Sequence, residues 1–134
     1  AKIRLMKIIA YQEKYPYTYC ICEKKSNSTI GLVGFTETEN KTSEDSGLGV
    51  RSRFFHKGYG TQVLHTMLKI LFESGAKNVV YSTFSDNENS VKLIKKFGFK
   101  KQSEKEFVSP KDGKTYLVEV YGLTKEDYER EKHV

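Results

Sequence analysis

A glycine-containing turn joins a predicted strand to the most strongly patterned helix of this sequence. The turn is HKGYGT, residues 56–61, and the strand before it begins at residue 47. Residues 58–74 carry apolar side chains at helical spacing, and Gly75 is placed to end the helix. These side chains are Val63, Leu64, Met67, Leu68, Ile70 and Leu71. A strand that leads into an amphipathic helix is typical of folds in which helices pack on a sheet.

The rest of the sequence alternates between strand and helix patterns. Strands are predicted at residues 17–23, 30–36, 78–84, 101–108 and 115–123. Helices are predicted at 2–13 and 87–97, a polar acidic loop at 37–46, and a fraying charged tail from residue 124. The first two strands form a hairpin, and two more close the chain. The pattern therefore predicts an α/β fold, with a mixed sheet and helices packed on it.

Size, hydropathy and charge limit the kinds of protein that this sequence can be. The 134 residues, 37% of them hydrophobic, predict one globular domain over residues 1–134. No apolar run reaches the roughly 18 residues that a membrane helix needs. The net charge of +6 favours anionic ligands in general, but lysine supplies most of it and the aromatic residues look structural. We therefore expect no membrane and no nucleic acid as a partner.

Two cysteines, Cys20 and Cys22, lie two residues apart in a predicted strand. A disulfide between them would need strained geometry, so we interpret them as small core side chains. No further Cys or His pair stands at ligand spacing, and no metal site is predicted. The cysteine content fits a reducing compartment, so a cytoplasmic location is expected.

The backbone at HKGYGT has the properties of an anion-binding site. A helix N-terminus carries unpaired N–H groups and the positive end of the helix dipole, and glycine lets an anion approach closely. Lys57 adds a positive charge, and Thr61 adds a hydroxyl. The segment therefore indicates a phosphorylated ligand, and a tight turn without a ligand is the alternative. It is not a Walker A loop, and Val63 takes the third glycine position of a dinucleotide fingerprint.

A second strand-to-helix junction carries polar residues of the same kind. The segment SDNENSVKLIKKFGF, residues 85–99, follows the next predicted strand and opens the next helix. Asp86 or Asn87 can cap this helix. Because open α/β sheets bind their ligands at the ends of neighbouring strands, the two junctions favour a ligand site there.

The two segments together resemble the GCN5-related N-acetyltransferases (GNAT), and most closely the RimJ/RimL branch, which acetylates protein N-termini. The matching residues are Lys57, Gly58, Tyr59, Gly60 and Thr61, then Asn87, Ser90, Lys96, Gly98 and Phe99. The resemblance implies the GNAT fold, with a mixed, mostly antiparallel central sheet and helices on both faces. Chains of this branch begin with a strand and helices before the hairpin, so we expect this chain to lack the N-terminal strand and helix, as a short member or a truncated one.

The resemblance also implies a co-substrate and a reaction. Acetyl-CoA would set its pyrophosphate on the backbone of residues 56–61, with His56 and Lys57 beside it. Its pantetheine arm would lie in a splay between the strands near Val50 and at 78–84, held also by Asn87. The acetyl group would pass directly to a primary amine of a protein N-terminus or a small molecule. The expected partners are acetyl-CoA and an amine acceptor, and the protein is a monomer or a homodimer.

The catalytic residues of the family are only partly matched. Ile94 stands where many members have a tyrosine acid, and Gly47 stands at about the position of the usual glutamate base. Ser90 is therefore the candidate proton donor or hydrogen-bond partner of the thiol sulfur, unless it only caps its helix. The weak candidates for the general base are Asp45, Asp86 and Glu119. A bound water could replace them, and the alternative function is a non-catalytic GNAT-like module that binds CoA.

Overall fold

Seven strands and three α-helices make up the described part of the protein. The structure is a computed structural model that describes residues 2–8, 16–50 and 58–132, with the backbone alone at 45–50 and 131–132. The strands are β1 (Ile3–Lys7), β2 (Thr18–Glu23), β3 (Thr29–Glu37), β4 (Thr42–Val50), β5 (Asn78–Phe84), β6 (Lys100–Val108) and β7 (Thr115–Thr124). The helices are α1 (Tyr59–Glu73), α2 (Glu88–Lys96) and α3 (Lys125–Lys132), with a 3₁₀ turn, η2 (Glu39–Lys41), before β4.

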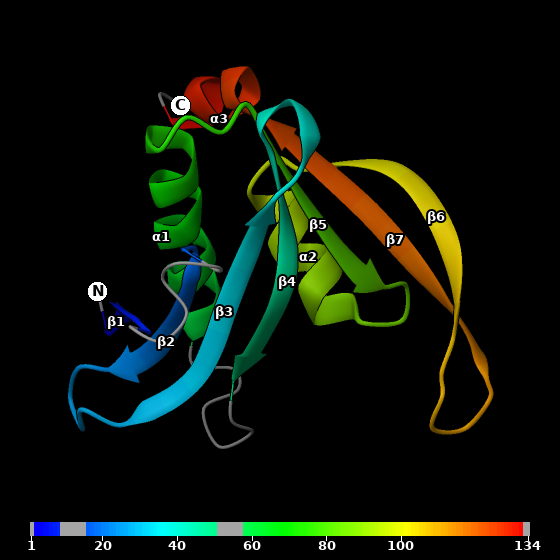
Figure 1. The fold of residues 1–134 in the computed structure, drawn as a ribbon, viewed down its shortest axis with the longest axis horizontal. Helices are drawn as coiled ribbons and strands as arrows, with labels where there is room; N and C mark the ends of the chain where they lie inside the picture. Colours follow the sequence, from blue (N-terminus) through cyan, green and yellow to red (C-terminus); the bar gives the residue numbers. More distant parts are fainter. Residues whose placement is uncertain (1, 9–15, 51–57, 133–134) are drawn as a thin grey trace.

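All seven strands belong to one sheet, in the order β1-β2-β3-β4-β5-β7-β6 (Figure 1). Within the described ranges, β4 and β5 pair in parallel and the other neighbouring strands pair antiparallel. This arrangement confirms the predicted mixed, mostly antiparallel sheet. The hairpins β2–β3 and β6–β7 were also predicted correctly, as were both central helices to within two residues at each end.

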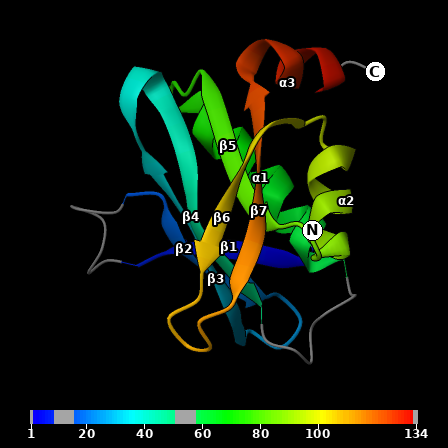
Figure 2. The same cartoon turned by 90° about the vertical axis from the view of Figure 1, so that its right-hand side faces the viewer.

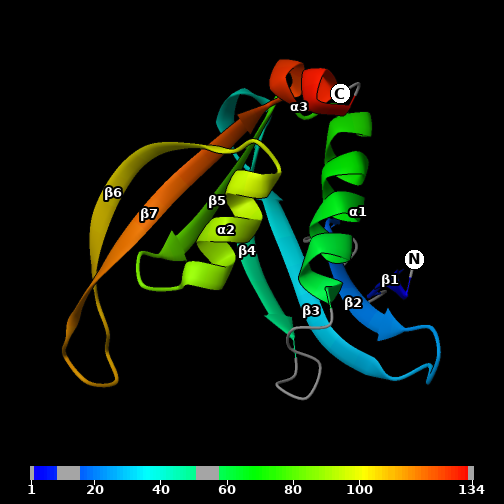
Figure 3. The same cartoon turned by 180° about the vertical axis from the view of Figure 1, so that it is seen from behind.

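Helices α1 and α2 lie side by side on the same face of the sheet (Figure 3). They touch near the start of α1, where a Cβ added at Gly60 would lie 3.5 Å from a Leu93 methyl of α2. Their buried faces share one apolar core with β5, which includes Leu68, Ile94 and Val79. Helices were expected on both faces of the sheet, whereas α1 and α2 share one face. Figure 1 views the sheet from the opposite face. No helix in the described part is long and apolar enough to cross a bilayer.

The helix predicted at residues 2–13 is wrong in its described part, where the chain forms strand β1. β1 pairs antiparallel with β2, with Ile3 opposite Glu23 and Leu5 opposite Ile21. Ile3 is buried in the core, whereas Met6 is about half exposed. The apolar spacing of this segment is compatible with a helix, but pairing with β2 provides backbone hydrogen bonds and covers Ile3, so tertiary context overrides the local pattern.

The acidic loop predicted at residues 37–46 is partly wrong, because β4 already begins at Thr42. Ser43 is buried, and its backbone pairs with β3 on one side and with β5 on the other. A strand with neighbours on both sides has its backbone groups satisfied whatever its polarity. Polar composition therefore concealed a central strand of the sheet.

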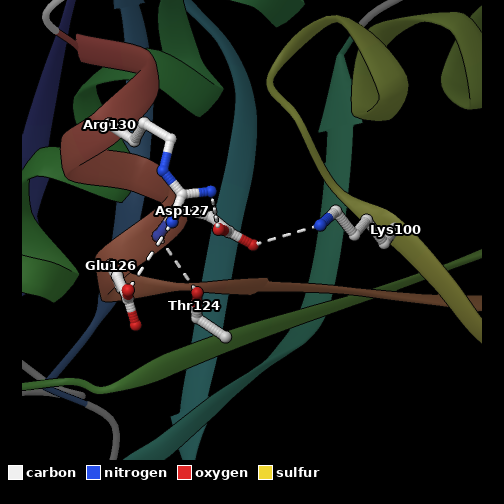
Figure 4. Close-up of polar contacts among 5 residues, drawn as sticks. All are labelled: Lys100, Thr124, Glu126, Asp127 and Arg130. Carbon is white, nitrogen blue, oxygen red and sulfur yellow. Dashed lines mark hydrogen bonds and ion pairs between the residues drawn. The ribbon is translucent and has the colours of Figure 1, made fainter.

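The charged tail, predicted to fray, forms helix α3 in its described part (Figure 4). Thr124 caps it, since its hydroxyl oxygen accepts a hydrogen bond from the Asp127 backbone N–H at 3.1 Å. The Asp127 carboxylate pairs with Arg130 at 2.9 Å and with Lys100 of β6 at 3.6 Å. The spacing T-x-x-D is a helix-start signal that the sequence does contain.

An aromatic contact joins α3 to the rest of the fold. The ring of Tyr128 stacks on Phe72 of α1, with centroids 4.6 Å apart and planes inclined by 24°. Phe72 is 2% exposed, so the end of the chain covers part of the core. Apolar contact in addition to the cap makes this helix stable, although a single helix of this length would be marginal in water.

The β6–β7 hairpin forms the edge of the sheet opposite β1, and it faces the viewer in Figure 2. All nine side chains of β6 are exposed, and β7 is its neighbour in the sheet. Its register pairs Lys105 with Val118 and Phe107 with Tyr116. The hairpin thereby places residues distant in sequence from β5 beside the end of that strand.

Candidate active site

Helix α1 begins without a side-chain cap. Its first flanking residue, Gly58, has φ of 77°, in the left-handed region, and no described side chain bonds to the helix start. Among the residues that the structure describes, none would lie within 4 Å of a Cβ at Gly58. The N-terminus of α1 thus presents backbone N–H groups and the positive end of a helix dipole that no described side chain covers, which suits an anion.

Substitutions at Gly58 should separate backbone strain from crowding. We expect Gly58→Ala to lower the free energy of unfolding by about 1–2 kcal/mol, because left-handed backbone is costly for a residue with a Cβ. Gly58→Asn should cost less, since asparagine tolerates this conformation. Urea unfolding of both variants is the measurement. Equal losses for the two variants would show that strain at φ of 77° is not the cause.

Tyr59 anchors the start of α1 to the β2–β3 hairpin. Its side chain is 6% exposed, and its hydroxyl donates a hydrogen bond to the Glu23 carboxylate at the end of β2. This hydrogen bond is the main cause that raises the pKa of the Tyr59 hydroxyl above its ordinary value. The Tyr59 side chain thus serves in packing, and of this residue only the backbone is left to bind a ligand.

Not every predicted cofactor-binding residue falls in the described ranges. His56 and Lys57 lie outside them, and for Val50 the backbone at the end of β4 is described. Gly60 and Thr61 lie in the first turn of α1, where both are partly exposed. The structure thus brings the second half of HKGYGT to a helix N-terminus, as the sequence predicted.

Strands β4 and β5 pair over three residues only. The parallel register runs from Thr42 opposite Asn78 to Glu44 opposite Val80. Beyond it β4 continues to Val50 and β5 to Phe84 without pairing to each other. The two strands therefore part at the ends that lead toward α1 and α2, which is the splay expected between them (Figure 1).

The start of α2 carries the two polar residues predicted for the second junction. Asn87 is the N-cap, and its side-chain oxygen accepts a hydrogen bond from the Ser90 backbone N–H at 3.2 Å. Ser90 is partly buried, and its hydroxyl makes no hydrogen bond to the described residues. The capping role of Asn87 is real, and the Ser90 hydroxyl remains available to a ligand.

A hollow of about 340 Å³ lies where β5 ends and α2 begins. Its lining comes from residues 81–84 of β5, Asn87 and Ser90 at the start of α2, and Lys105, Phe107 and Val118 of the β6–β7 hairpin. We call it the β5 hollow. Sequence reasoning did not identify the hairpin residues, because only the strand register brings them to β5. The one signal was the alternation of KEF at residues 105–107, which puts the first and third side chains on one face.

Neither Glu119 nor Asp86, two of the three candidate bases, is among the described residues that line the β5 hollow. Glu119 accepts a 2.5 Å hydrogen bond from the buried Tyr121 hydroxyl and lies 3.6 Å from the Lys101 ammonium. These contacts, led by the Tyr121 hydrogen bond, hold the pKa of Glu119 below its ordinary value, which makes it a weaker base. Asp86 is exposed outside the lining, and the Asp45 side chain lies outside the described residues.

Ile94, which takes the place of the family's tyrosine acid, is fully buried in the core. Cys22 is buried, Cys20 is partly buried, and both are free thiols. No group of three or more His, Cys, Asp or Glu side chains that could hold a metal occurs within the described ranges. The polar side chains among the described lining of the β5 hollow are those of Tyr81, Ser82, Thr83, Asn87, Ser90 and Lys105.

Comparison with known proteins gives one family match and several similar folds. A family model described as an acetyltransferase (GNAT) domain matches residues 1–100. An uncharacterized N-acetyltransferase of Bacillus subtilis, YoaA, is 26% identical over 117 residues, which cover 86% of this chain and 66% of that protein. The chain therefore spans about two thirds of the length of this relative.

Two solved structures illustrate the likeness in fold. The ribosomal-protein-S5-alanine acetyltransferase of Vibrio fischeri superposes with a TM-score of 0.74 at 17% identity, covering 90% of this chain and 68% of that one. Mutant forms of the spermidine/spermine N-acetyltransferase SpeG of Vibrio cholerae give a TM-score of 0.76 at 16% identity, covering 86% and 67%. Their acceptors, as named, are chemically different, so the shared fold does not determine the acceptor.

Proposed function

The chain belongs to the GNAT acetyltransferase family, and on that basis we propose that it transfers the acetyl group of acetyl-CoA directly to a primary amine. One observation carries the proposal. The uncapped start of α1 and the start of α2, with Asn87 and Ser90, follow the two parallel strands that part from each other. The starts of two helices, one without a described side-chain cap and one with polar side chains, thus lie at the same end of the sheet, which suits a long phosphorylated thioester.

The residues present fit acetyl-CoA. Backbone N–H groups in the first turn of α1 would hold its pyrophosphate, with Gly58 and Gly60 leaving room for close approach. His56 and Lys57, which precede this turn, would add positive charge. The pantetheine arm would pair with backbone near Val50, where β4 has no β5 partner, and with the Asn87 side chain. Acetyl-CoA supplies the activated acetyl group.

The proposed chemistry needs few groups from the protein. The neutral amine attacks the thioester carbonyl, the C–N bond forms, the C–S bond breaks, and the proton lost by the amine balances the one gained by the thiolate. Ser90 would donate a hydrogen bond or a proton to the leaving sulfur, since its hydroxyl is not engaged by the described protein. A water would take the proton of the amine, because no carboxylate is among the described residues that line the β5 hollow.

We place the chain nearest the RimJ/RimL branch within the family. The support is the N-x-x-S segment from Asn87 to Ser90, followed by the K-x-G-F ending at Phe99. A protein N-terminus or a small-molecule amine would then be the acceptor, and the protein would act as a monomer or homodimer. The two free thiols suit a reducing compartment, in keeping with a cytoplasmic location.

A non-catalytic module that binds CoA is the second candidate function. It is favoured by the buried Ile94 in the place of the tyrosine acid and by Glu119, whose pKa is lowered by Tyr121. Both candidates predict CoA binding, but only the enzyme predicts release of free thiol when an amine is added. A thiol-release assay with an amine panel therefore separates them.

Calorimetric titration with acetyl-CoA tests the binding step that both candidates share. We expect saturable binding to acetyl-CoA that ADP and heparin at equal charge do not reproduce, because the open start of α1 and the strand splay recognise different parts of the ligand. If only heparin bound, with an affinity that decreases steeply as the salt concentration rises, the result would instead indicate non-specific binding of polyanions by the net charge of +6.

The matched variant for this titration is Gly60→Ala. Its added Cβ would make only an ordinary 3.5 Å contact with Leu93, so the fold should be unaffected. If the ligand backbone contact is as close as proposed, the methyl group weakens acetyl-CoA binding by about tenfold, or about 1.4 kcal/mol. Unchanged affinity in this variant would remove Gly60 from the binding site.

A further inference from the structure

We propose that the acceptor is a free α-amino acid with a large apolar side chain, such as a phenyl group, bound in the β5 hollow by Phe84, Lys105 and Phe107. The inference rests on the proposed function and specifies its acceptor. The inference goes beyond the proposed function, which leaves the acceptor open, because a protein N-terminus, a polyamine and an amino acid all carry primary amines. The hollow distinguishes them by its wall, its charge and its size.

The wall of the hollow is an exposed aromatic cluster. The Phe84 ring lies 6.1 Å from the Phe107 ring and 5.6 Å from the Tyr116 ring, centroid to centroid. Phe84 and Phe107 are nevertheless 41% and 43% exposed, and Val118 lies between their strands. Grouped aromatic rings that remain open to water mark a surface for an apolar ligand.

The charge of the hollow comes from one lysine. Lys105 lines it, and its ammonium has no ion-pair or hydrogen-bond partner in the described part of the chain. By contrast, Lys101 on the same strand is paired with Glu104 and Glu119. No Asp or Glu is among the described lining residues. A free cation without an acidic neighbour in the lining attracts a carboxylate and disfavours a polycation such as spermidine.

The geometry of an α-amino acid suits these features together. Its amine and carboxylate share one carbon, so the amine can face Ser90 at the start of α2 while the carboxylate meets Lys105. The side chain then lies on the rings of Phe84 and Phe107. The volume of about 340 Å³ is at the small end for ligand sites, which suits one amino acid.

The reaction balances without a further reactant. The ammonium of the amino acid first loses a proton to water, and its nitrogen then forms the C–N bond as the C–S bond breaks. The products are an N-acetylamino acid and the CoA thiol. The carboxylate takes no part in the chemistry and serves only in recognition by Lys105.

The experiment compares four acceptors with the whole chain and acetyl-CoA, measuring thiol release and kcat/KM. We expect phenylalanine to have the highest kcat/KM of the four acceptors. Phenylalaninamide lacks the carboxylate and alanine lacks the ring, whereas spermidine is a polycation. Lys105→Met should lower kcat/KM for phenylalanine about tenfold, or about 1.4 kcal/mol, and leave phenylalaninamide unchanged. Phe107→Ala should lower the preference for phenylalanine over alanine about tenfold.

Lys111→Met is the control, because it removes the same charge from the turn of the same hairpin outside the lining. Faster turnover of phenylalaninamide than of phenylalanine would overturn the proposal in favour of a peptide N-terminus. A preference for spermidine would overturn it in favour of a polyamine. Either result leaves the proposed acetyltransferase intact.

A binding measurement keeps the proposal testable if no amine turns over. N-Acetylphenylalanine, the product, is titrated in the presence of CoA and followed by ligand-observed NMR. Binding that Lys105→Met weakens supports the site, and absence of binding rejects it. Absence of acetyl-CoA binding in the same sample would instead reject the proposed function.

Discussion

Ser90→Ala should lower kcat by about 100-fold while the affinity for acetyl-CoA stays the same. The Ser90 hydroxyl has no hydrogen-bond partner in the described protein, so its removal leaves no buried group unsatisfied. The backbone N–H of Ser90 still donates to Asn87, so the helix cap is retained. The loss therefore falls on the step in which sulfur leaves. Steady-state kinetics together with calorimetry provide the two quantities.

The control for this variant is Ser74→Ala, at the C-terminal end of α1. The Ser74 hydroxyl donates a 2.7 Å hydrogen bond to the Ile70 carbonyl and is exposed there. Its loss should leave kcat unchanged. A Ser90→Ala enzyme with normal turnover and normal acetyl-CoA binding would remove Ser90 from the mechanism and leave water or backbone to stabilise the thiolate.

Leu68→Ala should lower the free energy of unfolding by about 2–5 kcal/mol. Leu68 is fully buried between α1 and the sheet, where the lost methyl groups leave a cavity that the surroundings only partly fill. A domain of this size has only about 5–15 kcal/mol of stability in total. The measurement is urea unfolding, in which the dependence of the free energy of unfolding on urea concentration is checked for two-state behaviour.

The neighbouring exposed residue provides the control for Leu68. Lys69→Ala changes the next position of the same helix and should alter the free energy of unfolding by less than about 0.5 kcal/mol. Similar losses for both variants would mean that α1 is not packed as described. Acetyl-CoA affinity of the folded Leu68→Ala protein should remain normal, because the start of α1 lies two turns away.

Elements with a clear apolar pattern of their own could be predicted from the sequence. Strands that depend mainly on pairing with other strands could not. α1 has apolar side chains at every helical contact position, and β5 is a short apolar run, so both were placed correctly. β1 has spacing that a helix also allows, and the first part of β4 is polar. In both strands the stabilisation comes from pairing with neighbouring strands, which the pattern within the strand itself does not contain.

The same distinction applies to the candidate site. Asp86 or Asn87 was predicted as the cap of this helix, and the structure shows that it is Asn87, a role that depends on the next three residues only. Lys105 and Phe107 were missed because their position depends on the register of β6 with β7 and of β7 with β5. A one-residue shift of either pairing would turn both side chains to the opposite face.

The corner at which α3 begins is remote from the proposed site, and this has a practical use. The Lys125 backbone N–H bonds to the Lys77 carbonyl, and the Lys77 N–H bonds to the Lys41 carbonyl, so α3 starts where β5 starts. The β5 hollow is at the other end of that strand, about 20 Å away for seven residues. A fusion partner or surface tether joined after α3 would hold the protein by the end opposite the β5 hollow and leave the proposed site accessible, which makes immobilised turnover assays feasible.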